Sequence, residues 1–348
     1  MAVEECSGRG KPAWVEIVAR YHRPNTALAV GQIANSLLPC LAGLVLMFYL
    51  LRVHYGLVFL TGVVTGGFVI RMFIIQHDCG HGSFLKSGFW NDAVGTVLSL
   101  FTLTPYLAWR HDHAVHHATA GNLEGRGVGD IRTMTVAEYE ALPRWRRFWY
   151  RVYRNPLVLF GIGPTLYFVV GQRLTFNMKP RLHRERRNVF VTNLVLAVAI
   201  GAITLWLGWR PVVAVYFPVI LTAASVGVWL FYVQHQYDEA YWVHEDEWDY
   251  YTAAIHGSSY YRLPKLLQWF TGNIGLHHIH HLSPRIPNYL LQRCHDENPI
   301  FHRAHTLTLW SSLKTIPLAL YDQEARRLIS FREYRRRRPR VARLDKAA

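Results

Sequence analysis

Ten of the 19 histidines in this sequence fall in three short stretches, which we call the first, second and third histidine box. The first box is His77-Asp-Cys-Gly-His81, the second is His111-Asp-His113-Ala-Val-His116-His117, and the third is His277-His278-Ile-His280-His281. The second and third boxes share the pattern H-x-x-H-H. Residues three and four positions apart lie on one face of a helix, so each box can present several imidazoles side by side.

Imidazoles clustered in this way favour a metal site. A single histidine near a membrane surface is more often a satisfied polar residue than a ligand. Three clusters that met without a cation would leave buried nitrogen atoms unpaired and would repel one another when protonated. Imidazole binds iron, copper, nickel and zinc, so the ligand type leaves the metal open. The histidines are too many for one ion, which predicts a site for two metal ions.

Two familiar metal sites are excluded by the residues around the histidines. The first box is not the H-E-x-x-H motif of zinc proteases, because Asp78 stands where their catalytic glutamate would be. The chain also contains no Glu-x-x-His sequence, which excludes a carboxylate-bridged di-iron bundle. His235 ends an apolar segment and is a further candidate ligand, with an interfacial polar residue as the alternative.

Long apolar segments separate the boxes. Segments 27–51 and 56–75 predict one pair of membrane-spanning helices, and segments 189–207 and 212–233 predict a second pair. Each is near the roughly 18–20 residues that cross the hydrocarbon core of a bilayer. The sequence therefore predicts four spans.

Two other apolar stretches, 89–107 and 156–171, are interrupted by polar residues, glycine or proline. If either crossed the bilayer, the boxes would lie on opposite sides, whereas the ligands of one site must lie on one side. We therefore expect both stretches to be re-entrant or interfacial. The expected organisation is a single membrane domain, 1–348, made of an N-terminal segment 1–26, a transmembrane hairpin 27–75, a loop 76–188 with the first two boxes, a second hairpin 189–233, a region 234–328 with the third box, and a basic tail 329–348.

The charges give the orientation. The chain carries 38 Lys+Arg against 23 Asp+Glu, a net charge of +15, but the arginines gather in loop 109–188 and in the tail. This arrangement favours membrane topology over nucleic-acid binding, and the two short turns carry only Arg52 and Arg210. The positive-inside rule then places both termini and the boxes in the cytosol. The four cysteines form no C-x-x-C pair, and the first 26 residues do not form a signal peptide.

The boxes, in this order and spacing and with the isolated His235, resemble those of the membrane fatty-acid desaturase family. The stretch His77-Asp-Cys-Gly-His81-Gly-Ser-Phe is most similar to the acyl-lipid delta-12 and omega-3 branch, and the resemblance covers nearly the whole chain. It implies an all-α integral membrane protein with four transmembrane helices, re-entrant or interfacial helices, and a cytosolic histidine-rich cap that holds a di-metal site.

The resemblance also implies a ligand set for two iron ions, with no catalytic residue beyond the ligands. The implied ligands are His77, His81, His113, His116, His117, His235, His277, His280 and His281. His111 and His278 are extra histidines inside the boxes, and either could replace a neighbour. Asp78, Asp112 and Asn273 are expected to orient imidazoles, because metal-bound histidine commonly needs such a partner.

The implied activity is that of an O2-dependent fatty-acyl desaturase, an oxidoreductase that introduces a cis double bond into a lipid-linked acyl chain. An unactivated methylene has no acidic proton and no leaving group, so its oxidation needs a metal cofactor. The chain has no G-x-G-x-x-G motif, no cysteine cluster and no His-Pro-Gly-Gly haem motif. A separate ferredoxin or cytochrome b5 is therefore the expected electron donor. The expected location of the chain is a bacterial inner membrane rather than an organelle.

Two other functions remain open from the sequence. A hydroxylase, ketolase or epoxidase with the same boxes would act on an acyl chain, an alkane or a carotenoid, and it would differ only after the first hydrogen is removed. A membrane metal transporter is a more distant alternative, since it would place its ligands along a path inside the membrane rather than at the ends of spans.

Overall fold

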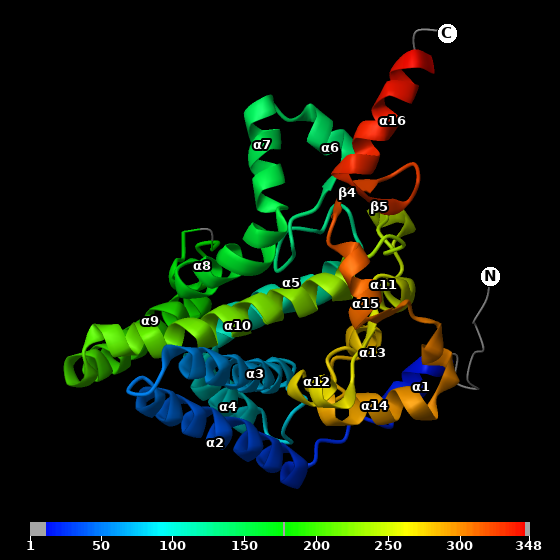
Figure 1. Cartoon of the computed structure of the whole chain (residues 1–348). Helices are drawn as coiled ribbons and strands as arrows, with labels where there is room; N and C mark the ends of the chain where they lie inside the picture. The colour runs from blue at the N-terminus through cyan, green and yellow to red at the C-terminus, as the bar shows by residue number, and fades with distance from the viewer. Residues whose placement is uncertain (1–11, 177, 345–348) are drawn as a thin grey trace.

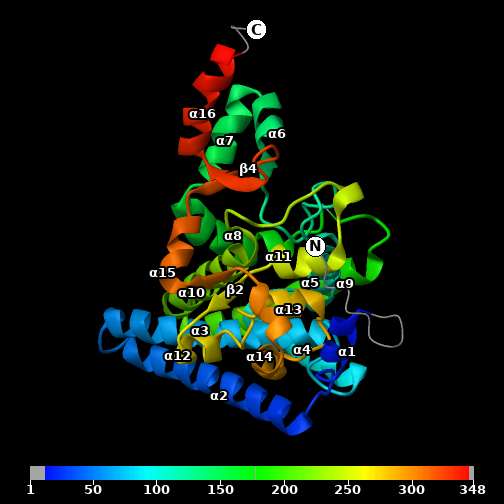
Figure 2. The ribbon, with the colours of Figure 1, turned by 90° about the vertical axis from the view of Figure 1, so that its right-hand side faces the viewer.

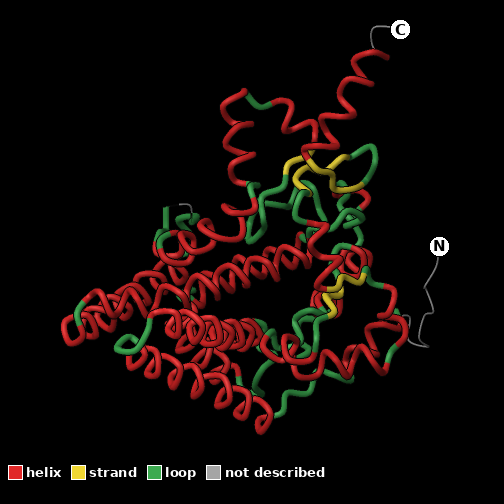
Figure 3. The backbone as a smooth tube through the Cα atoms, in the orientation of Figure 1, coloured by secondary structure: helices red, strands yellow, loops and turns green. Residues whose placement is uncertain are grey.

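The computed structural model describes residues 12–176 and 178–344 (Figure 1). Helices dominate it, and the few strands lie in two places, as Figure 3 shows. The α-helices are α1 Ala13–Ala19, α2 Thr26–Leu50, α3 Tyr55–Gly80, α4 Gly88–Thr102, α5 Tyr106–Thr119, α6 Val136–Ala141, α7 Arg144–Tyr153, α8 Gly163–Val169, α9 His183–Leu207, α10 Trp209–His235, α11 Tyr250–His256, α12 Lys265–Phe270, α13 His277–Leu282, α14 Asn288–Glu297, α15 Leu309–Ser312 and α16 Phe331–Leu344. Shorter helical turns are η1 Val158–Ile162, η2 Gly171–Arg173, η3 Glu245–Glu247, η4 Pro299–Arg303 and η5 Leu313–Thr315.

The four predicted spans are confirmed. Helices α2, α3, α9 and α10 have 25, 26, 25 and 27 residues and are apolar enough to cross a membrane. Large apolar side chains on them point outward, as with Leu38, which is 63% exposed, and Leu205, which is 91% exposed. Such exposure is costly in water and expected against lipid. The chain is therefore a membrane protein.

Helix α3 continues further than its apolar segment, which ends at residue 75, and includes most of the first box. The polar side chains of this last turn are buried with partners. Gln76 donates to the Thr104 carbonyl at 3.1 Å and accepts from the Thr102 hydroxyl at 2.6 Å. Because these bonds replace water, the helix extends to Gly80 without leaving the side chain of Gln76 unpaired.

The two interrupted apolar stretches do not form spanning helices in the described part of the chain. Helix α4 has 15 residues, about 22 Å, which is short of the roughly 30 Å hydrocarbon core. It ends at Thr102, and the next residue, Leu103, has a left-handed φ of 54° that turns the chain into α5. The second stretch forms the π-helical turn η1 followed by the 7-residue α8. Both outcomes agree with re-entrant or interfacial helices.

The start of α2 and the start of α9 lie at the same end of the helix bundle as the helices that follow the spans. The amide of Asn25, just before α2, donates to the Tyr289 hydroxyl in α14, and the amide of Leu107 in α5 donates to Asn188 near the start of α9. The turns that join α2 to α3 and α9 to α10 lie at the opposite end of the bundle (Figure 1). All three boxes can therefore meet at one end of the spans.

Helices α3 and α10 pack closely because two glycines of α3 face α10. A Cβ atom on Gly62 would lie 2.8 Å from the Pro218 ring, and one on Gly66 would lie 2.8 Å from the Thr222 side chain. Small residues let the backbones of membrane helices approach in this way. This contact matters for the site, since α3 carries His77 and α10 ends at His235.

Two small sheets are present that the sequence did not predict. The strands are β1 Met134–Thr135, β2 Tyr260–Arg262, β3 Thr306–Thr308, β4 Leu318–Asp322 and β5 Arg327–Ser330. Strand β4 pairs with β1 in parallel and with β5 antiparallel, and β2 pairs with β3 in parallel. Much of the expected tail also has structure, because α16 extends to Leu344. The remainder of that tail and the start of segment 1–26 lie outside the described residues.

Candidate metal centre

Four helices carry the predicted ligands. His77 lies in the last turn of α3, and His81 is the first residue after that helix. His235 is the last residue of α10. Helix α5 holds the second box and α13 holds the third, so the H-x-x-H-H spacing falls on helix in both cases, as predicted.

The structure brings the nine candidate histidines together in two groups. Within each group the potential ligand nitrogens all lie within 4.8 Å of one another. Group one is His77, His81, His113, His117 and His280, and group two is His116, His235, His277 and His281. The groups are adjacent, because the rings of His117 and His281 stack at 4.2 Å. His111 and His278 belong to neither group.

The nitrogen spacing fits a metal ion in each group. Within each group, several pairs of Nε2 atoms lie 2.9 to 3.1 Å apart. In group one these pairs are His113–His117 and His117–His280. In group two they are His116–His235, His235–His277 and His277–His281. Two imidazole nitrogens that bind one ion at ~2.1 Å, at angles of about 90–110°, are themselves about 3.0–3.4 Å apart. Each group can therefore close on one ion with little movement of its rings.

The protonation states also fit. Burial, reinforced by the charges of neighbouring imidazoles and, for His81, of Arg110, lowers the pKa of the group members outside the spans well below the usual value, in His81, His113, His117, His277, His280 and His281. These rings are neutral near pH 7 and keep a lone pair. The buried Nε2 atoms of His77 and His81 have no hydrogen-bond partner in the described chain. A cation would satisfy them.

Asp78 orients the ring of His77. One carboxylate oxygen lies 3.0 Å from His77 Nδ1, and the other accepts from the Asn288 amide at 2.6 Å and from its side chain at 2.8 Å. Asn273 lies one step further out, since its side chain donates to the Asn288 carbonyl. Gln32 of α2 donates to the Asn288 side chain, so the polar chain extends to a span.

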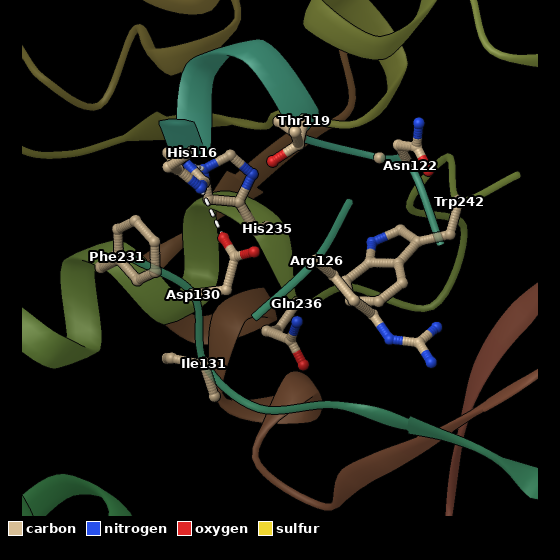
Figure 4. Close-up of a pocket in the computed structure, with 12 residues that line it drawn as sticks. His116, Thr119, Asn122, Arg126, Asp130, Ile131, Phe231, His235, Gln236 and Trp242 are labelled. Atoms are coloured by element: carbon tan, nitrogen blue, oxygen red, sulfur yellow. Dashed lines mark hydrogen bonds and ion pairs between the residues drawn. The ribbon is translucent and has the colours of Figure 1, made fainter. Parts of the chain in front are cut away.

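Asp130 is a residue that the sequence analysis missed. Its Oδ1 lies 2.5 Å from His116 Nδ1, as the dashed line in Figure 4 shows, and its Oδ2 accepts from the Gly127 amide at 3.1 Å. Burial of the Asp130 carboxyl raises its pKa, but the bonds from His116 and Gly127 outweigh burial and lower the pKa overall. The only signal in the sequence is an acidic residue after a glycine-rich stretch, a pattern that is equally common in surface loops with no ligand nearby.

The remaining candidates lie apart from the two groups. The Asp112 carboxylate makes no hydrogen bond to an imidazole within residues 12–176 and 178–344, and burial raises its pKa. His278 is fully buried beside His295 and Tyr260, and burial with the charge of His295 lowers its pKa to about 3.

In group two, His235 Nδ1 donates to the Gly257 carbonyl at 3.1 Å, which directs Nε2 into the group.

Comparisons with known proteins point in the same direction. Residues 12–312 match the profile of the family described as "Fatty acid desaturase". A "Fatty acid desaturase" of Bacillus subtilis is 42% identical over 315 residues, covering 90% of this chain and 89% of its own length. An "sn-1 oleoyl-lipid 12-desaturase" of Picosynechococcus is 29% identical over 80% of each chain. An "sn-1 acyl-lipid omega-3 desaturase (ferredoxin)" of Synechocystis is 28% identical over 72% of this chain and 70% of its own length.

Proposed function

This chain belongs to the fatty acid desaturase family, and we propose that it introduces a cis double bond into a lipid-linked acyl chain at two iron ions held by the nine histidines. The observation that carries the proposal is the pairing of two neutral, buried imidazole groups at one end of four spans. When bound, the two ions would supply the O2-dependent oxidation of an unactivated C–H bond, which no side chain can perform.

In this proposal the protein's own part is to hold the ligand rings in fixed positions. Asp78 and Asp130 accept from the Nδ1 atoms of His77 and His116, and the Gly257 carbonyl does the same for His235. A bond at Nδ1 fixes both the tautomer and the direction of Nε2. Each of the two groups thus has at least one ring fixed by the fold.

A narrow pocket beside both groups is where we propose that the acyl chain approaches the metal centre. It is lined by His117 of group one and His281 of group two, and otherwise by Ala120, Trp248, Tyr250, Ala253 and Ala254. The indole of Trp248 donates to the Ala120 carbonyl at 2.9 Å, and the Tyr250 hydroxyl donates to the His281 carbonyl at 2.8 Å. The pocket has no room for a water molecule in this structure, so we propose that the acyl chain reaches the two groups here when the rings of Trp248 and Tyr250 move apart.

The electron donor we propose is a separate protein, a ferredoxin or a cytochrome b5. Two cyanobacterial relatives carry "(ferredoxin)" in their names, which supports a soluble donor for this chain as well. We further propose that the histidine groups and both termini face the cytosol of a bacterial cell. The support is the basic loop 109–188 on the side of the boxes, together with the similarity to the Bacillus subtilis protein.

The test is the fatty-acid profile of a bacterial host that expresses the chain, measured as methyl esters by gas chromatography and mass spectrometry beside a His113→Ala control. We expect a new species two mass units below a host fatty acid, present only with intact His113, whose fragmentation locates the double bond. A product that gains one oxygen would instead identify a hydroxylase. An unchanged profile, with donor supplied and the protein present in the membrane, would refute action on acyl chains.

A further inference from the structure

Helix α7 presents an uncovered aromatic face. Trp145, Phe148 and Trp149 are exposed at 60%, 59% and 60%, and their spacing of three and four residues puts them on one side of the helix. Exposed aromatic groups of this size are rare on surfaces that face water. This face is therefore a candidate binding surface.

The opposite face of α7 is attached to the protein. The Tyr150 hydroxyl is buried and donates to the Ala319 carbonyl in β4 at 2.5 Å, and Arg151 donates to the Tyr139 hydroxyl in α6 at 2.7 Å. Arg154, which follows the helix, is buried and donates to the side chain of Gln236, the residue after His235. The direction of the aromatic face is thus fixed relative to the metal centre.

The charges of α7 are all positive. The helix contains four arginines and no acidic residue. Arg144 and Arg146 are exposed, and on a helix of 3.6 residues per turn they fall on opposite flanks of the aromatic face. Tryptophan with flanking arginine is typical of helices that lie at the surface of a bilayer, where the arginines reach phosphate groups.

The place of α7 in the fold matches that of a helix lying along the membrane surface. It stands crosswise to the spanning helix α10 in Figure 1, and in Figure 2 it lies above α10 and beside α6. The chain then runs through Leu157, which is 79% exposed, into η1, where the ring of Phe160 contacts Trp229 and Tyr232 close to the end of α10. The segment that follows α7 in the chain is therefore packed against a span.

We propose that α7 is an interfacial anchor that binds a bilayer surface rich in anionic headgroups, on the side of the membrane that carries the histidine site. Trp145, Phe148 and Trp149 insert at the level of the headgroups, while Arg144 and Arg146 contact phosphates. Through Tyr150 and Arg154 the anchor holds the β1–β4–β5 sheet at a fixed height beside the metal centre. The inference depends only on the chain spanning a membrane and not on its activity.

The test is a depth measurement with nitroxide labels on the full-length protein in lipid nanodiscs. The background variant is Cys6→Ser, because Cys40, Cys79 and Cys294 are buried. One label is placed by Phe148→Cys, and the control label by Ala325→Cys, an exposed position in the turn between β4 and β5. Both positions are exposed, so neither substitution disturbs the core.

We expect the label at 148 to collide severalfold more often with oxygen than with a water-soluble nickel chelate, and the label at 325 to show the reverse. Adding phosphatidylglycerol to phosphatidylcholine nanodiscs is expected to deepen position 148, and Arg144→Gln with Arg146→Gln is expected to remove that response. Equal nickel accessibility at the two positions in both lipids would refute the anchor. Protection of 148 that appears only after an acidic ferredoxin is added would refute it too, because the occupant would then be a protein.

Discussion

His116 and Asp130 are joined by a hydrogen bond of 2.5 Å between Nδ1 and Oδ1, although they come from a helix and from the loop that follows it. The bond directs His116 Nε2 to within 3.1 Å of His235 Nε2. The position of one imidazole ring in group two therefore depends on a carboxylate that lies outside all three boxes.

We predict that Asp130→Asn weakens iron binding in group two by roughly 10- to 100-fold, because the amide cannot accept the Nδ1 proton with the same strength and geometry. Iron per chain, measured during titration with a chelator, gives the comparison. Asp112→Asn is the matched control, since Asp112 lies in the second box but makes no hydrogen bond to an imidazole in the described structure. Equal losses in both variants would show that the His116 contact is not what matters.

Substitutions at His235 and His278 test which of the buried histidines are ligands. We expect His235→Ala to lower the iron content of the folded protein and abolish the product, because group two loses one of its four imidazoles. His278→Asn is expected to lower the melting temperature, since the ring is fully buried, while iron per folded chain stays constant. Metal analysis of the monodisperse fraction after size exclusion distinguishes the two. Loss of iron in His278→Asn would return His278 to the set of ligands.

The packing of α3 on α10 is open to a direct test. Gly62→Ala places a methyl group 2.8 Å from Pro218, and overpacking of this kind costs about 1–3 kcal/mol. We expect a lower melting temperature in detergent and less iron, because the helices that carry His77 and His235 are pushed apart. Gly31→Ala is the control, since nothing lies within 4 Å of its new methyl group, and it should show neither effect.

Removal of metal should destabilise the fold as well as the activity. Neutral imidazoles gathered within 4.8 Å lose their common partner when the ion leaves. A ligand at 1,000 times its dissociation constant stabilises a folded protein by about 4 kcal/mol per site. We expect a chelator to lower the melting temperature, Fe²⁺ to restore both stability and product, and Zn²⁺ to restore stability alone. A melting temperature indifferent to the chelator would contradict two structural metal positions.

The helical spacing of the boxes predicted that each presents several imidazoles side by side, and the resemblance to the desaturase family implied the same nine residues that the structure places in the two groups. The division into groups was not predicted. His116 and His117 are neighbours in sequence but lie in different groups, as do His280 and His281. Adjacent positions on a helix point about 100° apart, so this division follows from helix geometry once the facing helices are known.

Other features were beyond the sequence for physical reasons. Asp130 reaches His116 because Gly127 and Gly129 take positive φ values of 110° and 71°, and a loop path of this kind leaves no periodic pattern. The strands have two to five residues, too few for an alternation of buried and exposed side chains to be recognised. Helix α3 was predicted too short because its last turn is polar, and its burial depends on partners from α4 and α14.

Because adjacent histidines belong to different groups, the backbones of α5 and α13 set the distance between the two groups. Within residues 12–176 and 178–344, no carboxylate belongs to either group, so no acidic side chain is placed to set the spacing by bridging them. The helix itself sets that spacing through the fixed rotation from one residue to the next. Inserting a single residue between His116 and His117 would turn one ring by about 100° out of its group, whereas exchanging residues elsewhere on the outer faces of α5 would leave the interval unchanged.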